Sequence, residues 1–518
     1  MKKITKMLGA LGVLAPSAAF VAVSCTQKET ASQKYLEEMK NDPTVAALKE
    51  KFKNYSKAEL KILSGKHEAT QQSEDLIKAF NQFFGTNLRW IQGGGSGNYE
   101  TLIDANLTNG KTNGVILFSS EKAIGFSKYN NLLVDTSASE YLENATGQYE
   151  DITVGDKHFM PLSEESYGII YNKDLFAEKG IMVLEGKSFG DSTTYSADGV
   201  SLTKPTENYN GTVEKDGKLY VLSGDLTAAG FEVISAKLKD ANVQPFYNVS
   251  KAEGGNIWPI SSHTMNAVLS ARLLGSKGIH ADKYNEVVAD LKEHPENIFT
   301  ADTVKAFRDV LIDSYKAYNP EYSQLEKGTV DSTVAATNVA IGRAGMFQNG
   351  TWMYSQLKQT AKKYKNFGFL PLPIANVDNG KSSIFVAATH RWGATTENNN
   401  PQVKELTKLF LQFLYQTQTG IKFLSNEIGS SNPYAASTSV KVESANQLIT
   451  SVNNYTGANT ATWVMTNFPE KFNNANSDYI ELIQNLGSQN QGQTLSSLVS
   501  IYRKALEDAK TAAAESGK

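Results

Sequence analysis

The fold class follows from residues 60–118, which read LKILSGKHEATQQSEDLIKAFNQFFGTNLRWIQGGGSGNYETLIDANLTNGKTNGVILF. Three apolar runs in this stretch, 60–63, 88–92 and 115–118, have the length and composition of strands. Between the first two, apolar residues recur with the period of an amphipathic helix, at Leu76, Ile77, Phe80, Phe83 and Phe84. Strands that alternate with helices, the third strand being almost wholly apolar, predict a parallel sheet covered on both faces.

Polar residues follow these strands. Ligands of open α/β sheets bind beyond the carboxyl ends of the strands, so we expect a binding site there. The glycine-rich run 93–97 after the second strand predicts a tight turn, with an anion site at the next helix N-terminus as the alternative. The candidate hydroxyl-binding residues after the first and third strands are Lys66, His67, Glu68, Ser119, Ser120 and Glu121. The alternative for each of them is a place in a solvated turn.

Helical periodicity recurs further along the chain. It covers Phe231, Ile234 and Leu238, then residues 403–414, and finally an amphipathic helix at 495–506. A segment at 187–225 differs, being rich in Ser, Thr, Gly and Tyr. Its turn at Lys215-Asp216-Gly217 predicts hairpins in an inserted region.

The composition is that of a globular protein. The chain has 518 residues, 40% of them hydrophobic and 20% charged, which excludes disorder over most of its length and predicts two or three domains. The formal net charge of −3 gives no reason to expect a nucleic-acid partner. A single cysteine excludes an intramolecular disulfide and a zinc site with several thiolates.

The N-terminus predicts export. Three lysines precede an uncharged, mostly apolar stretch at 7–23, as in a signal peptide spanning residues 1–24. Ala22-Val23-Ser24-Cys25 resembles the bacterial lipobox, which implies that Cys25 is lipidated; an uncleaved membrane anchor is the alternative. Residues 25–57 carry the lipidated cysteine and a polar stretch interpreted as a tether. We therefore expect the protein on the extracytoplasmic face of the cell membrane.

No catalytic or metal-binding motif in the sequence is complete. The Gly-Lys-Ser/Thr triplets lack the earlier glycine of a phosphate loop, and His67-Glu68 is followed by Gln71 where a zinc site of the HExxH type needs histidine. The carboxylate pair Glu164-Glu165 is interpreted as a solvated turn. We expect no metal, no cofactor and no enzymatic activity.

Four segments in the same order resemble the extracellular solute-binding proteins of bacterial ABC importers, the sugar-binding family typified by maltose-binding protein. The first combines Met160-Pro161-Leu162 with the run YGIIYNKDLF at 167–176. The second combines GRAGM at 342–346 with Asn-Gly-Thr-Trp at 349–352. The third is GFLPLP at 368–373, and the fourth is Asn400-Pro401 with the helix at 403–415.

This resemblance implies an α/β, two-lobed periplasmic-binding-protein-like fold with interleaved lobes and multiple chain crossings. Lobe one is placed at 58–160 plus 389–436, and lobe two at 161–388 plus 437–518, with the insertion at 187–225. The implied function is a lipid-anchored monomer that captures a small solute, a carbohydrate, and delivers it to ABC permease subunits. An exported glycoside hydrolase and a surface adhesin or antigen on the same fold are the alternatives.

Tryptophans are the candidate sugar-stacking residues, because sugar C–H faces pack on aromatic rings flanked by polar groups. The resemblance implies that Trp352 and Asn349 of the Asn-Gly-x-Trp motif lie in the site. Local sequence context adds Trp258, Trp392 and Trp463, whereas Trp90 in a strand is expected in the core. The identity of the solute stays open, because this fold also binds phosphorylated polyols and polyamines.

Overall fold

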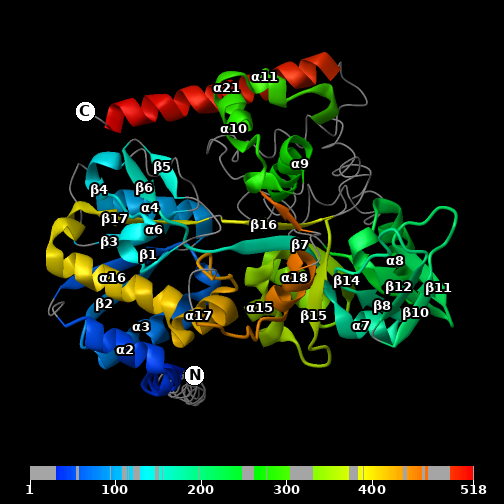
Figure 1. The fold of residues 1–518 in the computed structure, drawn as a ribbon, viewed down its shortest axis with the longest axis horizontal. Helices are drawn as coiled ribbons and strands as arrows, with labels where there is room; N and C mark the ends of the chain where they lie inside the picture. Colours follow the sequence, from blue (N-terminus) through cyan, green and yellow to red (C-terminus); the bar gives the residue numbers. More distant parts are fainter. Residues whose placement is uncertain are drawn as a thin grey trace, which may run out of the picture.

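The computed structural model describes residues 31–53, 58–93, 95–107, 114, 116–120, 129–145, 151–154, 156–197, 199–247, 262–275, 277–303, 331–372, 383–388, 390–435, 440–457, 461–464 and 491–516. Two mixed sheets, each covered by helices, form two lobes that lie side by side (Figure 1). The strands β7 (Glu165–Asn172) and β16 (Ile384–Ala387) run across the middle of the view. This arrangement confirms the predicted α/β two-lobed fold class.

Lobe one is built on a five-stranded sheet in the order β2-β1-β3-β17-β4. Its strands are β1 (Glu59–Ser64), β2 (Asn87–Gln92), β3 (Ile116–Ser120), β4 (Leu133–Val134) and β17 (Arg391–Thr395). The strands β2, β1 and β3 are parallel, as the sequence predicts. The strand β17 comes from far along the chain and pairs antiparallel with β3 and β4, so lobe one is completed by a returning segment.

Helices from both parts of the chain pack on this sheet. The Phe80 ring of α3 lies 5.1 Å, centroid to centroid, from that of Phe413 in α16. The helix α16 begins at Pro401. The Asn400 side chain caps it by accepting a hydrogen bond from the N–H of Gln402, and this cap fixes where the helix starts. The other elements of lobe one include α4 (Gly95–Leu107), β5 (Ile152–Val154), β6 (Lys157–Phe159), α6 (Ala138–Tyr141) and α17 (Gln418–Phe423), with α3 at Thr70–Phe84 and α16 at Pro401–Gln416.

The prediction of a polar tether at 25–57 does not agree with the structure of residues 31–53, the part of this range that the structure describes before residue 58. Residues 31–41 are helical and are followed by α2 (Pro43–Lys51). Met39 and Val45 are fully buried in the apolar core of lobe one. The prediction was wrong there because widely spaced apolar residues form one buried stripe in a helix, although the stretch is polar on average.

Lobe two is built on a six-stranded sheet in the order β13-β14-β7-β16-β18, with β15 also paired to β7. Every residue of the central strand β7 is buried. This strand is antiparallel to β14, β15 and β16. The strands are β7 (Glu165–Asn172), β13 (Gln244–Phe246), β14 (Ala344–Gly350), β15 (Phe367–Leu370), β16 (Ile384–Ala387) and β18 (Ala461–Trp463).

Helices cover the lobe-two sheet and share one large apolar core with it. Phe231, Ile234 and Leu238 of α8 are fully buried in that core, which confirms the predicted helical face. The C-terminal amphipathic helix, predicted at 495–506, is the longer α21 (Gln491–Ser516). The other helices are α7 (Lys173–Glu178), α8 (Ala228–Asp240), α9 (Ser262–Leu274), α10 (Tyr284–Glu293), α11 (Pro295–Ile298), α14 (Ser332–Ala340), α15 (Tyr354–Thr360) and α18 (Gln447–Gly457).

The segment predicted as an insertion forms short strands beside lobe two. The hairpin of β11 and β12 turns at Asp216 and Gly217, both with positive φ, which confirms the predicted turn. Phe189, Leu202 and Leu222 form a small apolar cluster of their own. The strands here are β8 (Ile181–Leu184), β9 (Thr194–Ala197), β10 (Val200–Thr203), β11 (Thr212–Lys215) and β12 (Lys218–Leu222).

Candidate functional site

Within the described residues, three segments connect the lobes and hydrogen-bond to one another. The N–H of Leu162 donates to the carbonyl of His390 (2.9 Å), and that of Trp392 donates to the carbonyl of Met160 (3.0 Å). Glu164 and Ser431 exchange two backbone hydrogen bonds, of 3.1 and 2.8 Å. The lobe boundaries drawn from the sequence stay a prediction, and they fall close to these paired crossings.

The carboxyl end of β1 meets the start of β7 beside these crossings. Lys66 follows β1, and its ammonium group pairs with the carboxylate of Glu165, the first residue of β7. The hydroxyl of Ser430 also donates to Glu165 (3.3 Å), and Glu68 lies 3.9 Å from Lys66 Nζ. Both members of the ion pair are buried, with side-chain exposures of 8% for Lys66 and 3% for Glu165.

Aromatic rings adjoin this ion pair. The Lys66 ammonium lies 5.7 Å from the ring centroid of Trp352, in the 3₁₀ turn η8 (Thr351–Met353) after β14. His263 of α9 stands edge-on to Trp352, with centroids 5.6 Å apart, and stacks on Tyr167 of β7 at 4.2 Å. We call Lys66, Glu68, Glu165, Tyr167, His263 and Trp352 the interlobe cluster.

Two glycines allow the close packing around Trp352. A Cβ atom at Gly350 would lie 2.1 Å from the indole Cη2, so only glycine lets the ring fold back on the end of β14. Gly429 has φ +74°, and a Cβ there would lie 2.6 Å from the Cα of Trp352. Since Gly429 belongs to the segment that returns from lobe one, the lobes touch at this tryptophan.

The histidines near the ion pair are neutral at pH 7. Burial, assisted by the charge of Lys66, lowers the pKa of His263 to about 4 although Glu165 opposes the shift. Desolvation and the neighbouring Lys66 likewise lower the pKa of His390 to about 3. Neutral imidazole offers one hydrogen-bond donor and one acceptor, the mixture that sugar hydroxyls require.

Several predicted site residues lie elsewhere. Trp392 is only 3% exposed, and its indole N–H donates to the Tyr415 hydroxyl (2.6 Å), which places it in the lobe-one core. Asn349 is fully buried and donates to Ser332 Oγ (3.1 Å), an internal hydrogen bond of lobe two. Trp463 in β18 packs against the lobe-two core and stands edge-on to His280. None of these three is in the interlobe cluster.

Other predicted residues are not described far enough to be placed. Trp258, Glu121 and Cys25 lie outside the described residues. His67 lies in the 3₁₀ turn η1 (His67–Ala69), and Ser119 and Ser120 end β3, but their side chains also fall outside what the structure describes. Lys66, Glu68 and Trp352 are therefore the predicted residues that the structure brings together.

Sequence reasoning missed Glu165 and His263. The interpretation of Glu164-Glu165 as a solvated turn was wrong for Glu165, which begins a wholly buried strand. A carboxylate two residues before the apolar run 167–171 was the available signal, since buried acids need a partner. His263 lies on a helix whose position over Tyr167 depends on tertiary packing, so no local pattern indicated it.

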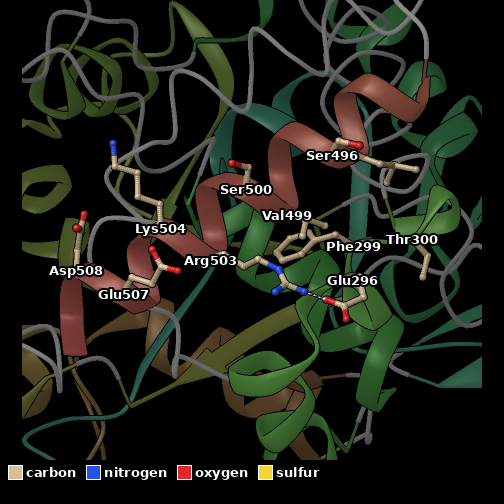
Figure 2. A pocket seen from close by; sticks show the side chains of 11 residues that line it. Glu296, Phe299, Thr300, Ser496, Val499, Ser500, Arg503, Lys504, Glu507 and Asp508 are labelled. Carbon is tan, nitrogen blue, oxygen red and sulfur yellow. Dashed lines mark hydrogen bonds and ion pairs between the residues drawn. The ribbon is translucent and has the colours of Figure 1, made fainter. Parts of the chain in front are cut away.

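A hollow lies away from this cluster, between α11 and α21. Figure 2 shows Arg503 of α21 and Glu296 of α11 pointing toward each other across it, where they form an ion pair. Its volume is about 950 Å³, and charged, hydroxyl and apolar side chains line it. Because no residue of the interlobe cluster lines this hollow, it is a separate feature of lobe two.

The profile of the bacterial extracellular solute-binding protein family matches residues 75–448. The match covers most of the chain and spans every member of the interlobe cluster except Lys66 and Glu68. The chain belongs to this family. None of the curated proteins matches it by sequence.

Solved structures of solute-binding proteins share the fold of this family member. RafE in complex with raffinose has a TM-score of 0.57 at 15% identity, covering 87% of this chain and 100% of that chain. BlMnBP1 from Bifidobacterium animalis subsp. lactis, in complex with mannobiose, has a TM-score of 0.54 at 14% identity, covering 89% of this chain and 98% of that chain. A sugar transporter from Bacillus licheniformis, in complex with stachyose, has a TM-score of 0.54 at 13% identity, covering 86% of this chain and 100% of that chain. At these identities the likeness establishes the two-lobed fold.

In the described ranges of this solute-binding protein, two features are absent. There, His, Cys, Asp and Glu side chains form no group of three that could hold a metal ion. In the same part of the chain, no helix combines the length and the apolar character needed to cross a membrane.

Proposed function

We propose that this family member captures a carbohydrate between its lobes and delivers it to an ABC permease. The observation that carries the proposal is the interlobe cluster, in which Lys66 of lobe one meets Glu165 and Trp352 of lobe two. An ammonium group donates to hydroxyl oxygens, a carboxylate accepts from hydroxyl groups, and an indole packs on sugar C–H faces. The raffinose, mannobiose and stachyose complexes of proteins with this fold agree with a sugar ligand.

In the proposed mechanism, solute shifts the lobes between arrangements. A sugar that binds beside Trp352 offers hydroxyl partners both to Lys66 of lobe one and to Glu165 of lobe two. Charge-assisted hydrogen bonds of this kind are about twice as strong as neutral ones, so they favour the lobe arrangement in which both charged groups reach the solute. Because the two groups come from different lobes, the solute stabilises the arrangement that the permease recognises.

A thermal-shift screen with raffinose, mannobiose, stachyose and a sugar phosphate tests the ligand class. A solute at 100 times its Kd should stabilise the protein by about 2.7 kcal/mol. The variant E165Q should weaken binding at least tenfold, whereas E178Q, at an exposed carboxylate of α7, should bind as the wild type does. A shift with the sugar phosphate alone would contradict a neutral sugar ligand.

The alternatives give different results in the same samples. An exported glycoside hydrolase would cleave the oligosaccharides, which mass spectrometry after overnight incubation would detect. A surface adhesin would bind host matrix while showing no thermal shift with any small solute. We propose a binding protein without catalytic activity, so intact oligosaccharides and a saturable shift are expected.

We also propose that Cys25 carries a lipid that holds this monomeric protein at the cell membrane. The support is the sequence Ala22-Val23-Ser24-Cys25 behind a signal-peptide-like leader. Metabolic labelling with a clickable fatty acid should label the wild type and leave the C25A variant unlabelled. Equal labelling of both proteins would place the lipid elsewhere.

A further inference from the structure

The C-terminal helix α21 is firmly attached to lobe two. Leu498, Tyr502 and Ala505 are at most 3% exposed and belong to the lobe-two core. The Tyr502 ring lies 5.4 Å, centroid to centroid, from Phe299 beside α11. The ion pair of Arg503 with Glu296 adds a contact on the neighbouring face of the helix (Figure 2). The segment from Leu498 to Ala505 is therefore an anchor.

The same helix continues beyond its anchor to lobe one. Residues of α21 lie within 8 Å, Cα to Cα, of the 3₁₀ turn η3 (Asn130–Leu132). Figure 1 shows the C-terminal end of the chain above β4, β5 and β6, which belong to lobe one. Leu132 packs against a lobe-one apolar cluster, and η3 leads directly into β4 of the lobe-one sheet. The helix thus touches both lobes.

The helix is stiff enough to transmit force between these two contacts. Sharp kinks arise at proline or glycine, and residues 493–516 contain neither. The ten residues after Leu506 extend about 15 Å at the rise of an α-helix. A rod fixed in lobe two cannot follow lobe one when the lobes rotate, so its contact with η3 exists in only some lobe arrangements.

We propose that α21 is an interlobe strut that stabilises the arrangement of the lobes seen here. A contact made in one arrangement and lost in another shifts the population toward the first by its differential free energy. The strut acts outside the interlobe cluster and does not depend on the solute, so this proposal stands or falls separately from carbohydrate capture.

Distance measurements on the solute-free protein test the strut. Spin labels are placed at K78C in α3 of lobe one and N453C in α18 of lobe two, in full-length protein with its single cysteine changed by C25S. Removing residues 507–518 should shift or broaden the distance distribution measured by double electron–electron resonance. Removing only Gly517 and Lys518, beyond the end of α21, is the matched control and should leave it unchanged.

A second pair of variants guards against loss of folding by truncation. E507P removes a helix hydrogen bond and bends the segment after the anchor, whereas E507A preserves the helix. E507P should reproduce the shift of the truncated protein, and E507A should match the wild type, with circular dichroism and gel filtration confirming folded protein. Distributions that stay the same in both the truncated protein and E507P would overturn the proposal.

Discussion

The ion pair of Lys66 with Glu165 links the lobes at the level of single residues. Both groups are removed from water, and the desolvation of a buried pair offsets much of its attraction. Such a pair adds little net stability to the folded protein. Removing one partner is nevertheless costly, because the other charge stays buried without its direct partner. This asymmetry predicts how substitutions at the two positions should combine.

We predict that E165L alone costs about 3 kcal/mol of unfolding free energy, because it leaves the buried Lys66 ammonium with the more distant Glu68 carboxylate, at 3.9 Å, in place of its direct partner. The double variant K66M/E165L should cost markedly less than the sum of the two single changes. Urea unfolding of all four proteins measures the coupling. Additive losses would show that the two charges do not depend on each other, and E37Q at an exposed pair should change little.

We predict acid sensitivity from His263. Its pKa falls from its ordinary 6.5 in the unfolded chain to about 4 in the folded protein, chiefly because the ring is desolvated. The unfolded state then binds more protons between pH 6.5 and 4, so this stability is complete above pH 6.5 and lost as pH falls to 4. The loss amounts to about 3 kcal/mol.

The variant H263F keeps the ring on Tyr167 and removes the titrating group. Urea midpoints measured at pH 7 and pH 4 should therefore differ less in H263F than in the wild type. An equal difference in both proteins would mean that other groups account for the acid sensitivity.

At the scale of elements, the N-terminal helices show how a polar segment becomes part of a core. Asp42 caps α2 by accepting from the N–H of Thr44 (2.9 Å), and it also accepts from the N–H and hydroxyl of Thr419 (2.8 Å each). Burial raises the pKa of Asp42, but these hydrogen bonds outweigh burial and hold the pKa below its ordinary value. One side chain thus joins α2 to α17.

We predict that D42A lowers the unfolding free energy by about 2 kcal/mol, since it removes a helix cap and leaves the Thr419 donors without their acceptor. Chemical unfolding measures the loss. E50A, at an exposed position of the same helix, is the control and should have little effect. A flexible tether at 31–53 would make D42A as silent as E50A.

At the scale of the whole molecule, the paired crossings would keep the lobes connected during the lobe closure that we propose. Solute that bonds both Lys66 and Glu165 adds contacts that require the lobes to be near each other. We predict that small-angle scattering shows a smaller radius of gyration at saturating sugar. W352A, which lacks the ring surface, should not compact under the same conditions; an unchanged radius in the wild type would contradict lobe closure.

The sequence alone determined the elements whose signals are local. The apolar runs of β1, β2 and β3, the helical face of Phe231, Ile234 and Leu238, and the turn at Asp216-Gly217 follow from periodicity and turn chemistry. Lys66 and Glu68 were indicated as candidate binding residues by their position after β1, and Trp352 by its resemblance to a family motif. These predictions needed no knowledge of which distant segments meet.

Only the tertiary structure decided which candidate residues lie together. Trp392 and Trp352 are the same residue type, yet one lies in the lobe-one core beside Tyr415 and the other meets Lys66 between the lobes. Glu165 gained its role from Lys66, a residue in another lobe and far away in the chain. Burial, desolvation and ion pairing depend on the segments that pack around a side chain, and local sequence does not encode that packing.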